Sequence, residues 1–560
     1  MEGHKDGEAI DQTVMGSPSG AEDTEVETAR DVLEGGQSVK RGIKARHFKL
    51  MAFGSAVGTG LFLAIGEALS RGGPLSVFLS YTLTSMAVYG TMQCLGEMGT
   101  WMPVTGAIPL YCSRFVDDAL GFAVGWNVSA DARFHVSGSL TSGQVWYANA
   151  MVVCTEASAA AIVIQYWTTT VNPAVWITIV IIVVILLNII AVSIFGEAEF
   201  IFSIVKLTTM IGLLILSLVI DLGGAPAQDR LGFRYWMVPG AMNEYIGTGA
   251  AGRFAGWFAT VIAAGFAFGG SEGIIAAAGE AKDPRKNIPT AIRIIFFRIL
   301  VFYVLGSLAV GLIVPYNDPR LLSGGAGAAA SPWVIGIVNA GIPVLPSILN
   351  AVILISAISV ANNMLFNASR YLYSLAQCGQ APRFLLRCSS RGIPYFAVGI
   401  TSSMTLLTYM TVSSGANKAF LWFMNITTFS SFLTWMTIAL SYIRFRAAIK
   451  AQGIGIKALP YRTPFQPYAA YFSLVYFGFV ALGNGFAVFT DGNWSTSDFI
   501  AAYIGLPIYI FLFAFWKIFK RTKLVRASSA DLSFPGQTTV HDGLNLENVG
   551  TGYSESLKPT

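Results

Sequence analysis

Four ionisable residues lie inside long apolar stretches of this chain: Glu97, Glu156, Lys206 and Glu272. A charged side chain is expensive at membrane depth, so such residues commonly bind ions or substrates or transfer protons. Because burial favours the neutral form of a lysine, Lys206 is the first candidate for exchanging a proton, and the three glutamates are further candidates. The alternative is structural, with Lys206 tethered to carbonyls or a carboxylate and each glutamate hydrogen-bonded between helices.

Two apolar stretches are unusually rich in glycine: Gly54–Phe62 and, about 210 residues later, Gly265–Gly273. Each glycine costs about 1 kcal/mol relative to alanine inside a helix. Freed peptide groups at membrane depth are tolerated where they line a cavity or are buried in protein. We therefore predict that both stretches are broken helices whose bare peptide groups bind a small charged molecule. The alternative is that the glycines let helices pack closely.

Composition places the chain among polytopic, all-α membrane proteins, because 54% of its 560 residues are apolar and 12% are charged. The net charge of +5 comes from basic residues in tails and loops and indicates no nucleic-acid partner. No metal or cofactor site is apparent in the spacing of its residues. Spans of about 20 apolar residues predict twelve transmembrane helices. They lie near 50–69, 75–98, 145–165, 174–193, 200–220, 254–280, 294–314, 344–375, 396–412, 420–443, 468–489 and 499–519.

The two ends of the chain are polar and flank a domain at 41–525. Residues 1–40 and 526–560 contain too few apolar residues to fold alone, so we expect disordered tails. Basic residues gather directly before the first span and in alternate loops, which by the positive-inside rule places both termini in the cytoplasm. If helices one to five and six to ten are two repeats, each begins with a broken helix, as in five-plus-five inverted-repeat transporters.

Ordered motifs along residues 41 to 520 resemble the fungal amino-acid permeases of the amino acid-polyamine-organocation superfamily. They are GSAVGTGLF from Gly54, CLGE from Cys94, PVTG from Pro103, GEAEF from Gly196, GFRYW from Gly232, VPYNDPRL from Val314, SR from Ser369 and GQAP from Gly379. The resemblance implies a twelve-helix fold with broken helices 1 and 6. It also implies proton-coupled uptake of amino acids, usually at the plasma membrane.

The same resemblance implies a set of substrate-binding positions. The N–H groups of Gly58, Thr59 and Gly60, with the Thr59 hydroxyl, would bind the carboxylate of an amino acid. The carbonyls that would accept from its ammonium group are those of Ala56, Phe266, Ala267 and Gly269. Phe266 and Phe268 are candidate gates, with ordinary helix packing as the alternative. The tenth helix would help line the side-chain pocket, and its candidates for specificity are Asn425, Thr427, Thr428, Ser430 and Ser431.

One stretch departs from the family pattern. Residues 128–144 interrupt the third helix and contain Asp131, Arg133 and His135, which do not suit a membrane span. Removing them would join Asn127 to Val145 and restore the family length. Val128-Ser129 and Gln144 can be encoded by splice signals, so we interpret the stretch as translation of a retained intron. The alternative is a genuine loop before the third helix, and sequencing the transcript distinguishes the two.

These residues together predict an integral membrane protein that imports amino acids with protons by alternating access. The nearest alternative is a permease for polyamines, choline or another amine. An amino-acid sensor without net transport is a further alternative. An enzyme is not expected, because no zinc-protease motif, nucleophile elbow or phosphate loop is present.

Overall fold

The computed structural model describes most of the chain between residues 54 and 533. The described residues are 54, 57–103, 107–125, 144–190, 192–273, 283–322, 331–377, 381–413, 416–490 and 492–533. Every regular element among them is a helix. Ala56, most of the stretch 128–144, and the tails up to residue 53 and from 534 onward lie outside the described residues.

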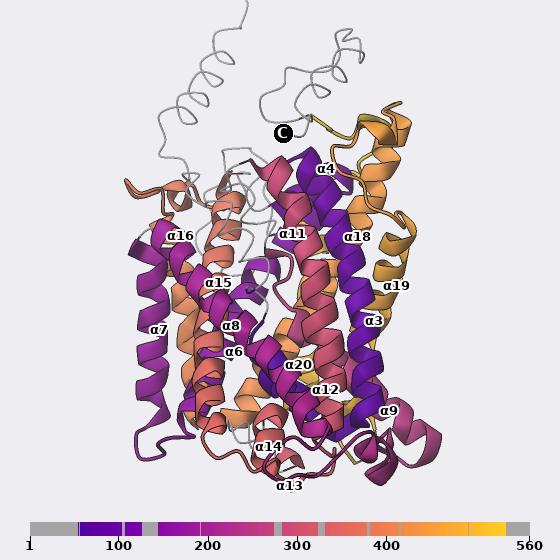
Figure 1. The fold of residues 1–560 in the computed structure, drawn as a ribbon. Coiled ribbons are helices and arrows are strands. Elements are labelled where there is room, and N and C mark those ends of the chain that lie inside the picture. The colour runs from indigo at the N-terminus through magenta and orange to yellow at the C-terminus, as the bar shows by residue number, and fades with distance from the viewer. Residues whose placement is uncertain are drawn as a thin grey trace, which may run out of the picture.

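The longer helices run side by side in one bundle, with α7 along one edge and α19 near the opposite edge (Figure 1). Their bounds are α3 Ile65–Trp101, α4 Ala107–Phe115, α5 Asp118–Gly125, α6 Gln144–Ile164, α7 Pro173–Ile190, α8 Val192–Asp221, α9 Gly249–Phe268, α11 Pro284–Arg298, α12 Leu305–Ile313, α13 Pro319–Leu322, α14 Pro332–Asn339, α15 Leu345–Gln377, α16 Tyr395–Met404, α17 Met410–Ser413, α18 Ala416–Ala451, α19 Tyr468–Leu482, α20 Thr496–Tyr503 and α21 Gly505–Lys520. Short π or 3-10 turns occur at η1 Gly60–Ala64, η2 Trp236–Gly240, η4 Ile299–Val304, η6 Arg383–Leu386, η7 Thr405–Tyr409, η8 Ile456–Ala458, η9 Phe486–Phe489 and η10 Ala527–Ser529.

Seven helical stretches in the described part of the chain are long and apolar enough to cross a membrane, and up to eight if one bent pair counts as a span. They are Trp146–Ile164, Pro173–Ile190, Phe195–Asp221, Gly249–Phe268, Arg285–Ile313, Leu345–Ala376 and Phe420–Ala451, and the bent pair is Thr496–Tyr503 with Gly505–Lys520. The chain is therefore an integral membrane protein. Figure 1 shows most of these helices running along the length of the bundle.

The expected helices at 50–69 and 75–98 meet inside α3. Gly73 has a φ of +80° and marks a kink, and Pro74 follows it directly. A Cβ on Gly73 would lie 2.9 Å from the backbone nitrogen of Asn243, so this turn needs glycine for both conformation and space. The element α3 therefore contains two helical stretches that meet at Gly73, between the helices predicted at 50–69 and 75–98.

Both glycine-rich segments interrupt helical geometry. Val57 and Gly58 are not helical, and the helix resumes at Thr59 with the π turn η1. In the second segment, α9 ends at Phe268, and Gly269 and Gly270 leave the helix with a ψ of 141° and a φ of +78°. The two segments touch, because a Cβ on Gly60 would lie 2.6 Å from the Cα of Ala267.

The last described residues pack back onto one end of the bundle. Asp117, between α4 and α5, accepts hydrogen bonds from Lys517 and from Thr522 at 2.7 Å. Farther along, the Trp101 indole donates to the Leu532 carbonyl at 3.2 Å. Residues 526–533, which were predicted to belong to a disordered tail, therefore include a packed segment.

Substituting Asp117 with asparagine should lower the thermal stability of the protein. Burial opposes ionisation of Asp117, but the Lys517 ammonium, the Thr522 hydroxyl and a backbone N–H outweigh it and hold its pKa below the usual value. A hydrogen bond to a charged group contributes about 1.5 to 3 kcal/mol, so D117N should lower the unfolding temperature at pH 7 by a few degrees. Because a depressed pKa stabilises the fold above the unfolded value of about 3.9, the difference should shrink as pH falls below it.

Thermal unfolding in detergent at several pH values measures this difference. Asp229→Asn is the matched control, because Asp229 forms its ion pair with Arg234 on the exposed surface. Exposed pairs contribute about 1 kcal/mol or less. A D117N variant that unfolds at the wild-type temperature would show that this contact does not stabilise the fold.

Candidate functional site

A small cavity lies where the two interrupted segments meet. Its walls come from both breaks and from α6, α15 and α18. The lining residues are Gly58, Gly60, Val152, Glu156, Phe266, Ala267, Gly269, Val360, Thr427 and Ser431. Five segments far apart in the sequence therefore converge on one site, and Glu156 is the ionisable residue among these lining residues.

The structure brings together most of the residues expected to bind substrate. Gly58, Gly60, Phe266, Ala267 and Gly269 all line the cavity. At these positions the helices are interrupted or ending, and all of the residues except Phe266 are glycine or alanine, which leave peptide groups close to the cavity. This is the arrangement that backbone recognition of a small molecule needs.

Thr59 is buried beside the cavity, and its side chain binds an acid. The Thr59 hydroxyl donates to Oε1 of Glu156 at 3.0 Å. A Cβ on Gly58 would lie 2.8 Å from the same oxygen, so the carboxylate sits directly against the first break. The other oxygen, Oε2, is buried and has no hydrogen-bond partner among the described residues. Glu156 therefore offers an available acceptor next to the proposed peptide donors.

The two candidate gate residues occupy different places. Phe266 lines the cavity and meets Phe420 edge to face, with ring centroids 6.4 Å apart. Phe268 does not line it but stacks on Tyr303, with centroids 4.2 Å apart. Phe266 is therefore the aromatic side chain placed to contact a bound molecule, and Phe268 packs behind the second break.

Helix α18 gives the cavity two of its hydroxyl residues. Thr427 and Ser431 line it, whereas Thr428 and Ser430 are buried without lining it. The hydroxyl of Thr428 donates to the Met424 carbonyl at 2.7 Å, one turn earlier in the same helix. Thr427 and Ser431 are one turn apart and thus share a helix face.

Lys206 lies behind the first break and does not line the cavity. Its ammonium group donates to the Gly54 carbonyl at 2.6 Å and to the Ser359 hydroxyl at 2.9 Å. Ser356, one turn before Ser359 on α15, donates to the Val57 carbonyl at 2.8 Å. The two side chains thus satisfy carbonyls near the break, as buried peptide groups at membrane depth require. A tether of this kind is compatible with proton exchange.

Glu97 and Glu272 lie outside the cavity and connect helices. Glu97 accepts from the Tyr442 hydroxyl at 2.5 Å and from the Thr463 backbone N–H at 2.8 Å. Glu272 accepts from the Trp435 indole at 3.0 Å. These contacts fit the structural alternative, in which each glutamate is hydrogen-bonded between helices. The Glu97 contact joins α3 to α18, and the Glu272 contact joins the second break to α18.

Three buried residues were not among those predicted from the sequence to form the site: the acid Glu199 and the apolar wall residues Val152 and Val360. Glu199 is fully buried on α8. It lies seven residues before Lys206, two helical turns away, and this spacing places both side chains on one face. This spacing could have identified Glu199 from the sequence as a possible partner of Lys206. The sequence has no such signal for the two valines, because a valine in an apolar helix can face the cavity, another helix or lipid.

Comparison with known proteins identifies the family of this chain. The family model described as amino acid permease matches residues 47–528. The chain is 41% identical over 520 residues to a proline-specific permease of Emericella nidulans, covering 92% of this chain and 91% of that protein. It is 45% identical over 471 residues to a probable proline-specific permease of Schizosaccharomyces pombe, covering 83% and 82%.

Two further similarities widen the comparison. A dicarboxylic amino acid permease of Saccharomyces cerevisiae is 41% identical over 501 residues, covering 88% of this chain and 79% of that protein. Among solved structures, a manganese transporter of Eremococcus coleocola aligns with a TM-score of 0.51 at 13% identity, covering 85% and 94% of the two chains. At that identity the second similarity concerns the fold alone.

Proposed function

This chain belongs to the amino acid permease family, and on that premise we propose that it carries amino acids across a membrane together with protons, by alternating access. The observation that supports the proposal most is the cavity bounded by both helix breaks. Broken helices offer N–H groups to a carboxylate and carbonyl groups to an ammonium group. A zwitterion can therefore bind through peptide groups, with side chains left to select among amino acids.

Lys206 and Glu156 are the proposed proton-coupling residues. Both are almost fully buried and both contact the first break, Lys206 at Gly54 and Glu156 at Thr59. A change in protonation at either residue would alter the hydrogen bonds that hold this break. We assign Glu97 and Glu272 a smaller part, because their contacts lie away from the cavity.

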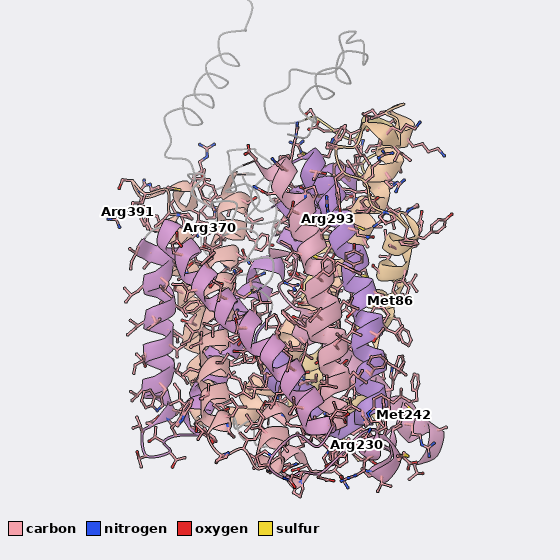
Figure 2. All side chains as sticks on the ribbon, in the orientation of Figure 1. Met86, Arg230, Met242, Arg293, Arg370 and Arg391 are labelled. Atoms are coloured by element: carbon pink, nitrogen blue, oxygen red, sulfur yellow. The ribbon has the colours of Figure 1, made fainter. Side chains whose placement is uncertain are left out.

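The proposal includes the membrane arrangement expected from the sequence. We propose twelve transmembrane helices in a five-plus-five inverted repeat, a plasma-membrane location and cytoplasmic termini. Figure 2 shows Arg293 and Arg391 toward one end of the bundle and Arg230 toward the other. The positive-inside rule assigns the end with more basic residues to the cytoplasm. Labelling of single cysteines placed at positions 230 and 391 would test this orientation.

We further propose that the substrate is a small neutral amino acid, with proline the first to test. The cavity wall combines Val152, Val360 and Phe266 with the hydroxyl residues Thr427 and Ser431. No basic residue is among the described lining residues, so the wall offers no charged partner for a second carboxylate. Two similar permeases are named for proline, which agrees with an apolar side-chain pocket.

Uptake of all twenty labelled amino acids by cells producing the full chain, with and without a proton gradient, tests the function. The form lacking residues 128–144 should be measured beside it, because an active deletion form would favour the retained-intron interpretation. We expect gradient-dependent accumulation of proline or another small neutral amino acid. Uptake of labelled polyamines or choline without amino-acid uptake would instead indicate an amine permease. Amino-acid binding with no flux would indicate a sensor.

A further inference from the structure

One face of α8 carries three buried polar side chains. Glu199, Ser203 and Lys206 are spaced by four and three residues, and each is exposed by 1% or less. Their neighbours Ile201 and Ile204 are 59% and 42% exposed. The polar face therefore points into the bundle, and the isoleucines point toward lipid.

Helix α15 supplies the partners of these residues. Lys206 donates to the Ser359 hydroxyl at 2.9 Å, and that hydroxyl donates to Oε2 of Glu199 at 3.0 Å. Asn362 donates to Oε1 of the same carboxylate at 2.8 Å. Because a serine hydroxyl has a single proton, Ser359 accepts from the ammonium group and donates to the carboxylate. Asn188 of α7 fixes Asn362 by donating to its side-chain oxygen at 2.8 Å.

Few other charges act on this pair. The helices α7 and α12, which also pack on α8, contain no ionisable residue. The one charged residue of α15 is Arg370, whose guanidinium carbon lies 3.7 Å from the centroid of the Phe366 ring, and its other titratable side chains are Tyr371 and Tyr373. Glu156 and Arg298 act on Lys206 through space, with opposite signs. Glu199 is thus the acid joined to Lys206 by hydrogen bonds, and an isolated buried ammonium group would be costly.

We propose that Glu199 is the counter-ion of Lys206, with Ser359 linking the two, and that this positioning residue sets the pH range in which Lys206 carries its proton. The inference rests on the proposed role of Lys206 in coupling. Glu199 contacts neither the cavity nor the proposed substrate. Its effect should therefore appear in the pH dependence of transport and not in the affinity for substrate.

Glu199→Gln tests the proposal, because glutamine keeps an acceptor for Ser359 but removes the charge. The full chain is reconstituted in liposomes, and gradient-driven uptake of L-proline is measured from pH 4 to pH 8. An opposite charge nearby shifts titration by about 1 to 3 units. The alkaline limb of the uptake profile should therefore move to lower pH by about one unit or more, with the KM for proline within about twofold of wild type.

Exchange of proline between the two sides of the liposome membrane, with no gradient, separates the possible failures. If wild type exchanges proline but its uptake ignores pH, the proposed proton coupling fails. If wild-type uptake depends on pH and E199Q gives the same profile, the counter-ion role alone is overturned. A purely structural role would lower the rates at every pH without moving the limb.

A second pair of variants tests the link without removing a buried charge, and it decides the question if E199Q does not reach the membrane. Ser359→Ala should move the limb in the same direction by a smaller amount. Ser359→Thr keeps the hydroxyl and should retain the wild-type profile. An S359A profile that coincides with the wild-type profile overturns the proposal.

Discussion

Substituting Gly60 with alanine should reduce uptake by about tenfold or more. The new Cβ would lie 2.6 Å from the Cα of Ala267, a distance that side chains do not tolerate. The atom it meets belongs to the backbone of the second break, so no flexible side chain can move aside. Overpacking of this kind costs about 1 to 3 kcal/mol. The two walls of the cavity would separate, and peptide groups of both breaks would no longer converge on one substrate.

Gly212→Ala is the matched control for this substitution. Gly212 is also a helical glycine in an apolar span, but nothing lies within 4 Å of a Cβ placed there. Because alanine favours a helix over glycine by about 1 kcal/mol, G212A should keep full uptake and equal or greater stability. The measurement is initial uptake rate corrected for the amount of protein at the membrane. Wild-type uptake by G60A would show that the two breaks need not approach so closely.

The two helix breaks were predictable from the sequence because their cause is local. Glycines clustered inside apolar stretches, as at Gly58, Gly60 and Gly269, disfavour a continuous helix wherever the rest of the chain lies. The resemblance to the permease family implies that both stretches bind one substrate, and the structure places Gly60 against Ala267.

Which face of each buried helix points toward the cavity was less predictable. Helix α18 has hydroxyl residues at adjacent positions, as at Thr427 and Thr428, so its sequence cannot say that Thr427 faces the cavity and Thr428 does not. Phe268 shows the same limit, since Tyr303, far along the chain, decides where its ring stacks. The packed segment at 526–533 was missed because its contacts are largely backbone carbonyls, such as that of Leu532, which composition does not reveal.

Substituting Lys206 with alanine should abolish accumulation against a gradient while leaving substrate exchange. The side chain lies outside the cavity, so the proposed peptide groups for binding remain. What is lost is the ammonium contact to Gly54 and Ser359, and with it the group proposed to carry the proton. Accumulation at steady state should fall at least about tenfold, whereas exchange of L-proline across liposomes should stay within about threefold of wild type. Lys206→Met, which preserves more of the side-chain volume, should give the same pattern.

Ser356→Ala separates coupling from tethering. Ser356 also donates to a carbonyl at the first break, that of Val57, but it carries no ionisable proton. If these contacts only hold the break in place, S356A and K206A should both lower accumulation and exchange together. If Lys206 carries the proton, K206A alone should separate accumulation from exchange. Full accumulation by K206A would remove Lys206 from the coupling role and leave Glu156, on the other side of the break, as the remaining acid against it.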